Sequence, residues 1–272
     1  MKKKAMAAVS AAVCASMLLS ACGSSASTST TAASAETTAA EAKAEGTTAA
    51  SESAAPGDVV TINIGFENTT EEPIGQAVEK WAELLKEESN GTMELKVFAN
   101  SALGNKSKLI DQMVMGENVI TIADGAYYAD YGVPDLGILY GPFFFDDWDE
   151  VWKLIDSDWY KEQCGKLANK GLTVLGSNWV YGERELMTKD KVVVPADIKG
   201  KKIRLANSQI YVEGFNALGA TAVPMALGDV YTSLQNGTLD GVENPLSTLY
   251  GQSFQEVTKN ILMTGHILNF TT

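Results

Sequence analysis

The chain has a single histidine, His266, and only two arginines, Arg184 and Arg204, among its 272 residues. One histidine excludes a metal site built from several imidazoles and leaves little for histidine-based acid–base catalysis. No G-x-S-x-G, Walker or G-x-G-x-x-G sequence follows a predicted strand, so the common hydrolase and nucleotide motifs are missing. We therefore expect neither a cofactor nor enzyme activity. His266 is interpreted as a partly buried structural residue, with a functional role as the alternative.

Basic residues and cysteines are also scarce. The formal net charge of −13 excludes nucleic acid as an expected partner, because phosphate binding needs a basic surface. The same charge excludes electrostatic attraction to an anionic lipid surface. Of three cysteines, Cys14 and Cys22 lie near the N-terminus and Cys164 stands alone, so we expect no intrachain disulfide in the globular part.

The N-terminus has the pattern of a lipoprotein signal. A charged cluster, Lys2–Lys4, precedes an apolar stretch, Ala5–Leu19, which has the length of a signal-peptide core and is short for a membrane span. Small residues then precede Cys22. This pattern predicts a signal peptide over residues 1–22 and a lipid anchor on Cys22 at the outer face of the cytoplasmic membrane. The alternative is an ordinary signal peptide with a chance cysteine.

Residues 23–57 consist almost entirely of Ser, Thr, Ala and Glu. Such a segment cannot bury enough apolar surface to offset its ordering entropy, which predicts a disordered tether. The globular part then covers residues 58–272, a length that suits one large domain or two smaller ones.

The globular part alternates predicted strands and helices. Alternating apolar residues predict a strand at Val59–Ile64, and apolar spacing of three to four predicts a helix from Pro73 to the Asn90-Gly91 stop. The pattern continues with strands at 94–98, 119–123, 172–176, 185–188, 201–205 and 223–225, and helices at 106–115 and 229–235. Trp148 and Trp152 lie four apart and are interpreted as core packing. This alternation predicts βαβ units and a mainly parallel sheet.

The two arginines are candidates for binding an anion. The chain uses lysine at its other basic positions, so each arginine suggests a need for the planar fork of donors that a carboxylate accepts. Arg204 ends a predicted strand, where open α/β sheets place their ligands. Arg184 follows Gly182 in a predicted turn. The alternative for each is a salt bridge between domains.

An ordered set of short motifs surrounds these arginines. The set comprises Ser101-Ala102-Leu103-Gly104, Gly182-Glu183-Arg184, Ile203-Arg204, Ala217-Leu218-Gly219-Ala220, Pro224-Met225, Asp229-Val230-Tyr231 and Asp240-Gly241-Val242-Glu243-Asn244-Pro245-Leu246. It resembles the solute receptors of tripartite ATP-independent periplasmic (TRAP) transporters, the DctP-like family, over Val59 to Thr272. Asp229, Val242 and Leu227 depart from the residues that this family commonly has.

The resemblance implies a two-lobed α/β fold of the periplasmic-binding-protein type (class II), with a central mixed, mainly parallel sheet in each lobe. We expect a first lobe at 58–181, a second lobe at 182–269, and a return to the first lobe beginning at 270–272. Family members usually continue past the position of Thr272, so we expect the C-terminal part of the fold to be missing and apolar surface to be exposed.

The resemblance also implies the ligand-binding residues. An Arg at the position of Arg204 pairs with a ligand carboxylate, an Asn at that of Asn244 bonds the same group, and an Arg at that of Arg184 adds a second contact. Glu67 and Asp124 fall at positions that reach ligand hydroxyls or water, with solvated strand ends as the alternative. Asn207 completes the candidates.

The expected function is an extracytoplasmic receptor that captures a small organic acid for the membrane subunits of a TRAP transporter. C4-dicarboxylates, sugar acids including uronates, and keto acids all present the carboxylate that Arg204 would bind, and Glu67 and Asp124 favour hydroxylated sugar acids. The alternatives are a receptor of an ATP-driven (ABC) transporter, a sensor or adhesion lipoprotein, and a carboxylate-using hydrolase.

Overall fold

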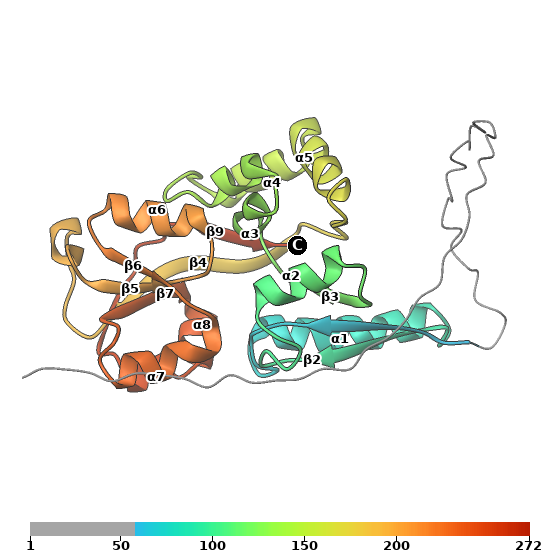
Figure 1. The fold of residues 1–272 in the computed structure, drawn as a ribbon, viewed down its shortest axis with the longest axis horizontal. Helices are drawn as coiled ribbons and strands as arrows, with labels where there is room; N and C mark the ends of the chain where they lie inside the picture. The colour runs from blue at the N-terminus through green and yellow to red at the C-terminus, as the bar shows by residue number, and fades with distance from the viewer. Residues whose placement is uncertain (1–57) are drawn as a thin grey trace, which may run out of the picture. The chain divides into compact units, whose positions relative to one another are not determined.

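The computed structural model describes residues 58–272. The predicted signal peptide, Cys22 and the tether lie outside these residues. The described part forms a two-lobed α/β fold with one sheet in each lobe (Figure 1). None of its helices combines the length and apolar composition that a bilayer span requires.

The first lobe is built on a three-stranded parallel sheet in the order β2-β1-β3. Its strands are β1 (Val60–Gly65), β2 (Met93–Phe98) and β3 (Val119–Thr121), and helices α1 (Pro73–Glu88) and α2 (Lys106–Val114) connect them. Pro73 begins α1 as the sequence predicted, since proline at the first helical position leaves no intrahelical hydrogen bond unmade. The core of this lobe comprises Ile64, Phe66, Val78, Leu95 and Ile122.

The second lobe is built on a mixed sheet in the order β6-β5-β7-β4-β8. Strand β5 pairs in parallel with β6 and β7, whereas β4 pairs antiparallel with β7 and β8. The elements of this lobe are β4 (Trp179–Thr188), β5 (Lys202–Leu205), α6 (Gln209–Ala217), β6 (Thr221–Pro224), α7 (Val230–Gln235), β7 (Gly241–Pro245), α8 (Leu246–Gly251) and β8 (Asn260–Leu262).

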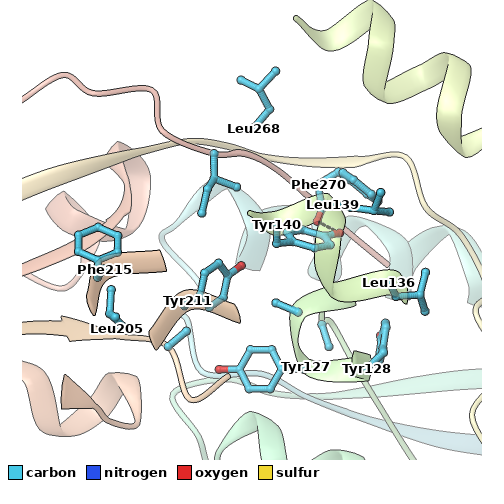
Figure 2. Close-up of a cluster of buried hydrophobic side chains, with 14 of the residues drawn as sticks. Tyr127, Tyr128, Leu136, Leu139, Tyr140, Leu205, Tyr211, Phe215, Leu268 and Phe270 are labelled. Atoms are coloured by element: carbon cyan, nitrogen blue, oxygen red, sulfur yellow. Dashed lines mark hydrogen bonds between the residues drawn. The ribbon is translucent and has the colours of Figure 1, made fainter. Parts of the chain in front are cut away.

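A third core lies around the helices that follow β3. These are α3 (Gly125–Asp130), the 3-10 helix η1 (Pro134–Tyr140), α4 (Trp148–Ile155) and α5 (Asp158–Ala168). Figure 2 shows Tyr140 beside Phe270, and the Tyr140 hydroxyl donates to the Phe270 carbonyl at 3.0 Å. Trp148 stacks on Trp152 and packs against this core, as predicted.

Strand β4 connects the two parts of the fold. Its first half pairs antiparallel with β9 (Leu268–Thr271), and its second half pairs with β7 and β8. After β9, Thr272 exchanges two backbone hydrogen bonds with Ala123, which follows β3. The predicted lobe boundary between residues 181 and 182 therefore falls inside a continuous strand.

The strand predicted at Leu172–Gly176 is wrong, because these residues adopt no regular structure. A groove of about 720 Å³ runs between this segment and β3, lined also by Trp81, Trp179 and Thr272. An extended segment becomes a strand only when a neighbouring strand takes its backbone hydrogen bonds. Within the described residues, the groove separates this segment from β3.

Candidate functional site

The two arginines lie in the sheet of the second lobe, and each side chain is 2% exposed. Arg204 lies at the carboxyl end of β5, as predicted. Arg184 lies within β4 and not in a turn between two strands, so that part of the prediction is wrong. The glycine that suggested the turn, Gly182, has a φ of 129° at an irregularity in the β4–β9 pairing, where the chain stays extended.

Arg184 has a protein partner for each of its guanidinium nitrogens. Its Nε and Nη2 donate to the two carboxylate oxygens of Glu243 at 2.6 and 2.7 Å, and its Nη1 donates to Asn269 at 2.7 Å. The guanidinium also lies 4.8 Å from the ring centroid of Tyr211. This arrangement is the fork-to-fork geometry of a buried ion pair. Arg184 is therefore held by protein groups rather than directed at a free site.

Glu243 is the centre of this buried cluster. Burial raises the pKa of Glu243, but the charge and hydrogen bonds of Arg184 outweigh burial and lower that pKa to about 2. Burial lowers the pKa of Arg184, and the Glu243 carboxylate more than restores it, so the Arg184 pKa is raised. The Nε2 of His266 lies 3.2 Å from Glu243, and its Nδ1 lies 2.8 Å from the Thr264 hydroxyl. His266 is 3% exposed, which agrees with the structural interpretation.

Arg204 is bonded by the protein on one side only. Its Nε and Nη2 donate to the same backbone oxygen, that of Met225, at 3.0 and 2.7 Å. Its Nη1 is buried and has no hydrogen-bond partner. In residues 58–272 no carboxylate forms an ion pair with Arg204. Burial lowers the pKa of Arg204, and Arg184 lowers it further, while Tyr127, Glu67 and Glu243 act in the opposite direction.

Asn244 supplies the second unpaired group. The parallel pairing of β5 with β7 places Arg204 beside Val242, so Asn244, two residues farther along β7, projects from the same face. Asn244 is 4% exposed, and its Oδ1 has no hydrogen-bond partner. Among the described residues, Arg204 Nη1 and Asn244 Oδ1 are the two buried side-chain polar atoms left unsatisfied. Both line one cavity.

Two carboxylates of the first lobe face the same cavity. Glu67, which follows β1, is 9% exposed, and the backbone N–H of Leu227 in the second lobe approaches it at 3.5 Å. Asp124 caps helix α3 by accepting from Ala126 N–H at 3.1 Å, and its other oxygen accepts from the Tyr211 hydroxyl at 3.2 Å. Neither residue is a solvated strand end. Glu67 keeps acceptor capacity for another group, whereas Asp124 is largely occupied by the protein.

The cavity brings together residues from both lobes. It has a volume of about 20 Å³, room for a single water molecule. Five predicted site residues line it: Glu67, Asp124, Arg184, Arg204 and Asn244. Sequence reasoning missed other polar residues of the lining, which are Asn68, Lys106, Tyr127 and Tyr181. Lys106 and Asn68 lie at strand-to-helix junctions, and the sequence predicts such junctions. The direction of each side chain, in contrast, is set by the packing of the lobes.

Asn207 does not join this set. It is exposed and lines a separate open hollow of about 470 Å³ with Ser107, Asp111 and Tyr131. The chain turns after β5, so that Ala206 lines the cavity and Asn207 points elsewhere. The polar residues of the cavity include cationic donors, among them Arg204 and Lys106, and carboxylate acceptors. Across residues 58–272, no group of three or more His, Cys, Asp or Glu side chains is arranged to hold a metal ion.

The sequence is similar to a known protein family and to characterised relatives. The family described as "Bacterial extracellular solute-binding protein, family 7" (DctP) matches residues 64–271. The 2,3-diketo-L-gulonate-binding periplasmic protein YiaO of Escherichia coli is 31% identical over 207 residues, which are 76% of this chain and 62% of that protein. The chain spans 58% to 63% of the length of three of the curated relatives that it matches.

Solved structures show the same similarity. A TRAP periplasmic solute-binding protein from Ochrobactrum anthropi with bound L-fuconate is 40% identical, with a TM-score of 0.76, and the match covers 78% of this chain and 70% of that one. A TRAP periplasmic solute-binding protein from Actinobacillus succinogenes with bound L-galactonate is 37% identical, with the same TM-score and coverage.

Proposed function

Because the chain belongs to the DctP family of bacterial extracellular solute-binding proteins, we propose that it is an extracytoplasmic receptor for a small organic acid. Arg204 binds the carboxylate of this acid, the two lobes enclose it, and side chains of the lining move aside to widen the cavity beyond the volume of one water molecule. The observation that carries the proposal is a buried guanidinium with an unpartnered Nη1 beside an unpartnered Asn244.

A carboxylate is the group that best complements this arrangement. A buried cation is costly unless it is paired and hydrogen-bonded, and the Met225 carbonyl satisfies only part of Arg204. A hydrogen bond to a charged group contributes about 1.5–3 kcal/mol. With Asn244 as placed, Oδ1 accepts a hydrogen bond from a hydroxyl next to the carboxylate. With the amide rotated by half a turn, Nδ2 donates to the carboxylate itself.

The first lobe favours an acid that carries hydroxyl groups. Glu67 is a nearly buried acceptor facing the cavity, and a ligand hydroxyl can donate to it. A second ligand carboxylate would instead meet the negative charges of Glu67 and Asp124. The relatives described above are named for or hold 2,3-diketo-L-gulonate, L-fuconate and L-galactonate, all sugar acids. We therefore favour sugar acids over C4-dicarboxylates or simple keto acids.

The proposal extends to partners and location. Relatives of this chain are periplasmic and TRAP solute-binding proteins, which supports delivery of the acid to the membrane subunits of a TRAP transporter. The signal pattern at residues 1–22 supports attachment to the membrane through lipid on Cys22. Mass spectrometry of the N-terminal peptide from the native host would identify that lipid.

A thermal-shift screen of the full chain against sugar acids, uronates, C4-dicarboxylates and keto acids tests the proposal. An acid supplied at one hundred times its Kd should add about 2.7 kcal/mol of stability. Arg204→Met keeps an unbranched apolar stem but removes the charged donors, and should weaken binding at least about 100-fold.

Lys202→Met, an exposed change on the same strand, is the matched control and should bind like the original chain. Equal shifts for Arg204→Met and the control would contradict the role of Arg204. No shift with any acid would contradict the receptor function.

A further inference from the structure

Glu72 is a buried carboxylate that connects the two lobes outside the cavity lining. It immediately precedes α1, is 2% exposed, and forms no ion pair within residues 58–272. Two donors come from its own lobe, the Thr69 N–H at 3.0 Å and the Asn68 amide at 2.7 Å. Two come from the second lobe, the Thr248 hydroxyl at 2.9 Å and the Gln252 amide at 2.8 Å.

The hydrogen bonds around Glu72 have one consistent direction. The Thr248 hydroxyl donates its one hydrogen bond to Glu72, so it accepts a hydrogen bond from the Tyr181 hydroxyl at 2.7 Å. The Tyr181 hydroxyl in turn accepts from the Asn68 amide at 3.0 Å. Each hydroxyl in this series of hydrogen bonds therefore donates to the next group, and the series ends on the Glu72 carboxylate. Because Asn68 and Tyr181 also line the cavity, this network reaches the candidate site.

Gly251, the last residue of α8, shows how closely the lobes approach here. A Cβ added to Gly251 would overlap Cγ of Glu72 and lie 2.8 Å from its Cδ, well inside van der Waals contact. The backbone of Gly251 is ordinary helix and not left-handed, so its conformation alone would admit alanine. The three atoms nearest to an added Cβ all belong to Glu72, so the contact between lobes disfavours a side chain here.

We propose that Glu72, Thr248 and Gly251 form an interlobe clasp that holds the closed arrangement and thereby sets ligand affinity without touching the ligand. The proposal rests on the receptor function proposed above. The observed affinity of a receptor that binds when closed depends on how much of it is closed, so a contact remote from the ligand changes Kd through that fraction. Another contact between the lobes, from the Leu227 N–H to the Glu67 carboxylate, is longer, at 3.5 Å.

Gly251→Ala tests the clasp because its methyl would clash with Glu72 in the arrangement described, and separation of the lobes would relieve that clash. Overpacking of this kind should weaken binding of L-galactonate or L-fuconate between about fivefold and 150-fold, with thermal stability unchanged or higher. Gly165→Ala is the matched control, since it adds the same methyl to helix α5 with nothing within 4 Å, and its affinity should not change. Equal affinities for the two variants would overturn the clasp.

The double variant Glu72→Ala/Gly251→Ala removes the atoms that the new methyl would meet. Its Kd should return to that of Glu72→Ala alone, which is itself weaker than the original because two bonds between lobes are lost. This non-additivity is the signature of a direct contact. Purely additive losses would overturn the assignment of Gly251 to the clasp.

A distance measurement tests the clasp independently of the receptor function. Spin labels at exposed Lys80 on α1 and exposed Asn236 after α7 report the separation of the lobes without any acid. Gly251→Ala should shift the distance distribution of the full chain to longer values, and Gly165→Ala should not. Unchanged distances in Gly251→Ala would overturn the clasp. Absence of binding by every form would overturn the receptor function, while these distances would still decide the clasp.

Discussion

Arg184 and Arg204 are the two arginines of the chain and are buried to the same degree, yet their surroundings differ. Arg184 is bonded by Glu243 and Asn269 and stacks on Tyr211. Arg204 meets a single carbonyl and keeps one nitrogen unpartnered. Burial alone therefore does not identify a binding residue. The difference lies in which donors the protein leaves unsatisfied, because an unpaired buried donor is retained only where another partner completes it.

The largest expected effect separates the two arginines by stability. Arg184→Met leaves the Glu243 carboxylate buried without its cation and should lower the free energy of unfolding by about 3–5 kcal/mol. Arg204→Met removes a cation that has no carboxylate partner, so its loss of stability should be much smaller. Urea unfolding of both variants measures this difference at unchanged m-value. Equal losses of stability in the two variants would contradict the different roles assigned to the two arginines.

The pH dependence of stability sharpens the same comparison. The pKa of Glu243 is about 2 in the folded chain, below its ordinary value of 4.5. The stabilisation of the fold by ionised Glu243 is therefore fully present above about pH 4.5 and is lost as the pH falls toward 2. The shift corresponds to about 3 kcal/mol. The stability difference between the original chain and Glu243→Gln should shrink by that amount between pH 4.5 and pH 2, measured by urea unfolding at each pH. A constant difference would contradict the buried ion pair.

The smallest effects distinguish the two first-lobe carboxylates. Asp124→Asn loses an acceptor for Tyr211 and should lower the free energy of unfolding by about 1–2 kcal/mol, with affinity little changed. Glu67→Gln should do the reverse, weakening binding of a hydroxylated acid about tenfold while stability stays within about 0.5 kcal/mol. Calorimetric titration and thermal unfolding of this matched pair give both quantities. If Asp124→Asn weakened binding and Glu67→Gln lowered stability, the roles assigned to these two carboxylates would be wrong.

Most of the fold could be predicted because its signals are local. Pro73 and the Asn90-Gly91 stop delimit α1, and the alternation at residues 59–64 identified β1. The failure at Leu172–Gly176 has a different origin. A strand is defined by its neighbour, and its sequence does not say whether a neighbour is present.

The candidate site was predicted in part for the same reason. Arg204 and Asn244 were identified from sequence motifs, and the structure places them on one face of neighbouring strands. The ion pair of Arg184 with Glu243 depends on the antiparallel pairing of β4 with β7, which no local pattern reveals. Lys106 and Tyr181 enter the cavity only because the lobes meet there.

Strand β4 has a consequence for how the molecule can be divided. Its first half is hydrogen-bonded to β9 and its second half to β7 and β8, while Thr272 is bonded to Ala123 behind β3. Neither lobe is then a single excisable stretch of chain, and a cut or an insertion within residues 179–188 disturbs both at once. Exchange of a whole lobe between two such proteins therefore needs more than one cut in the chain, and each cut must lie outside residues 179–188.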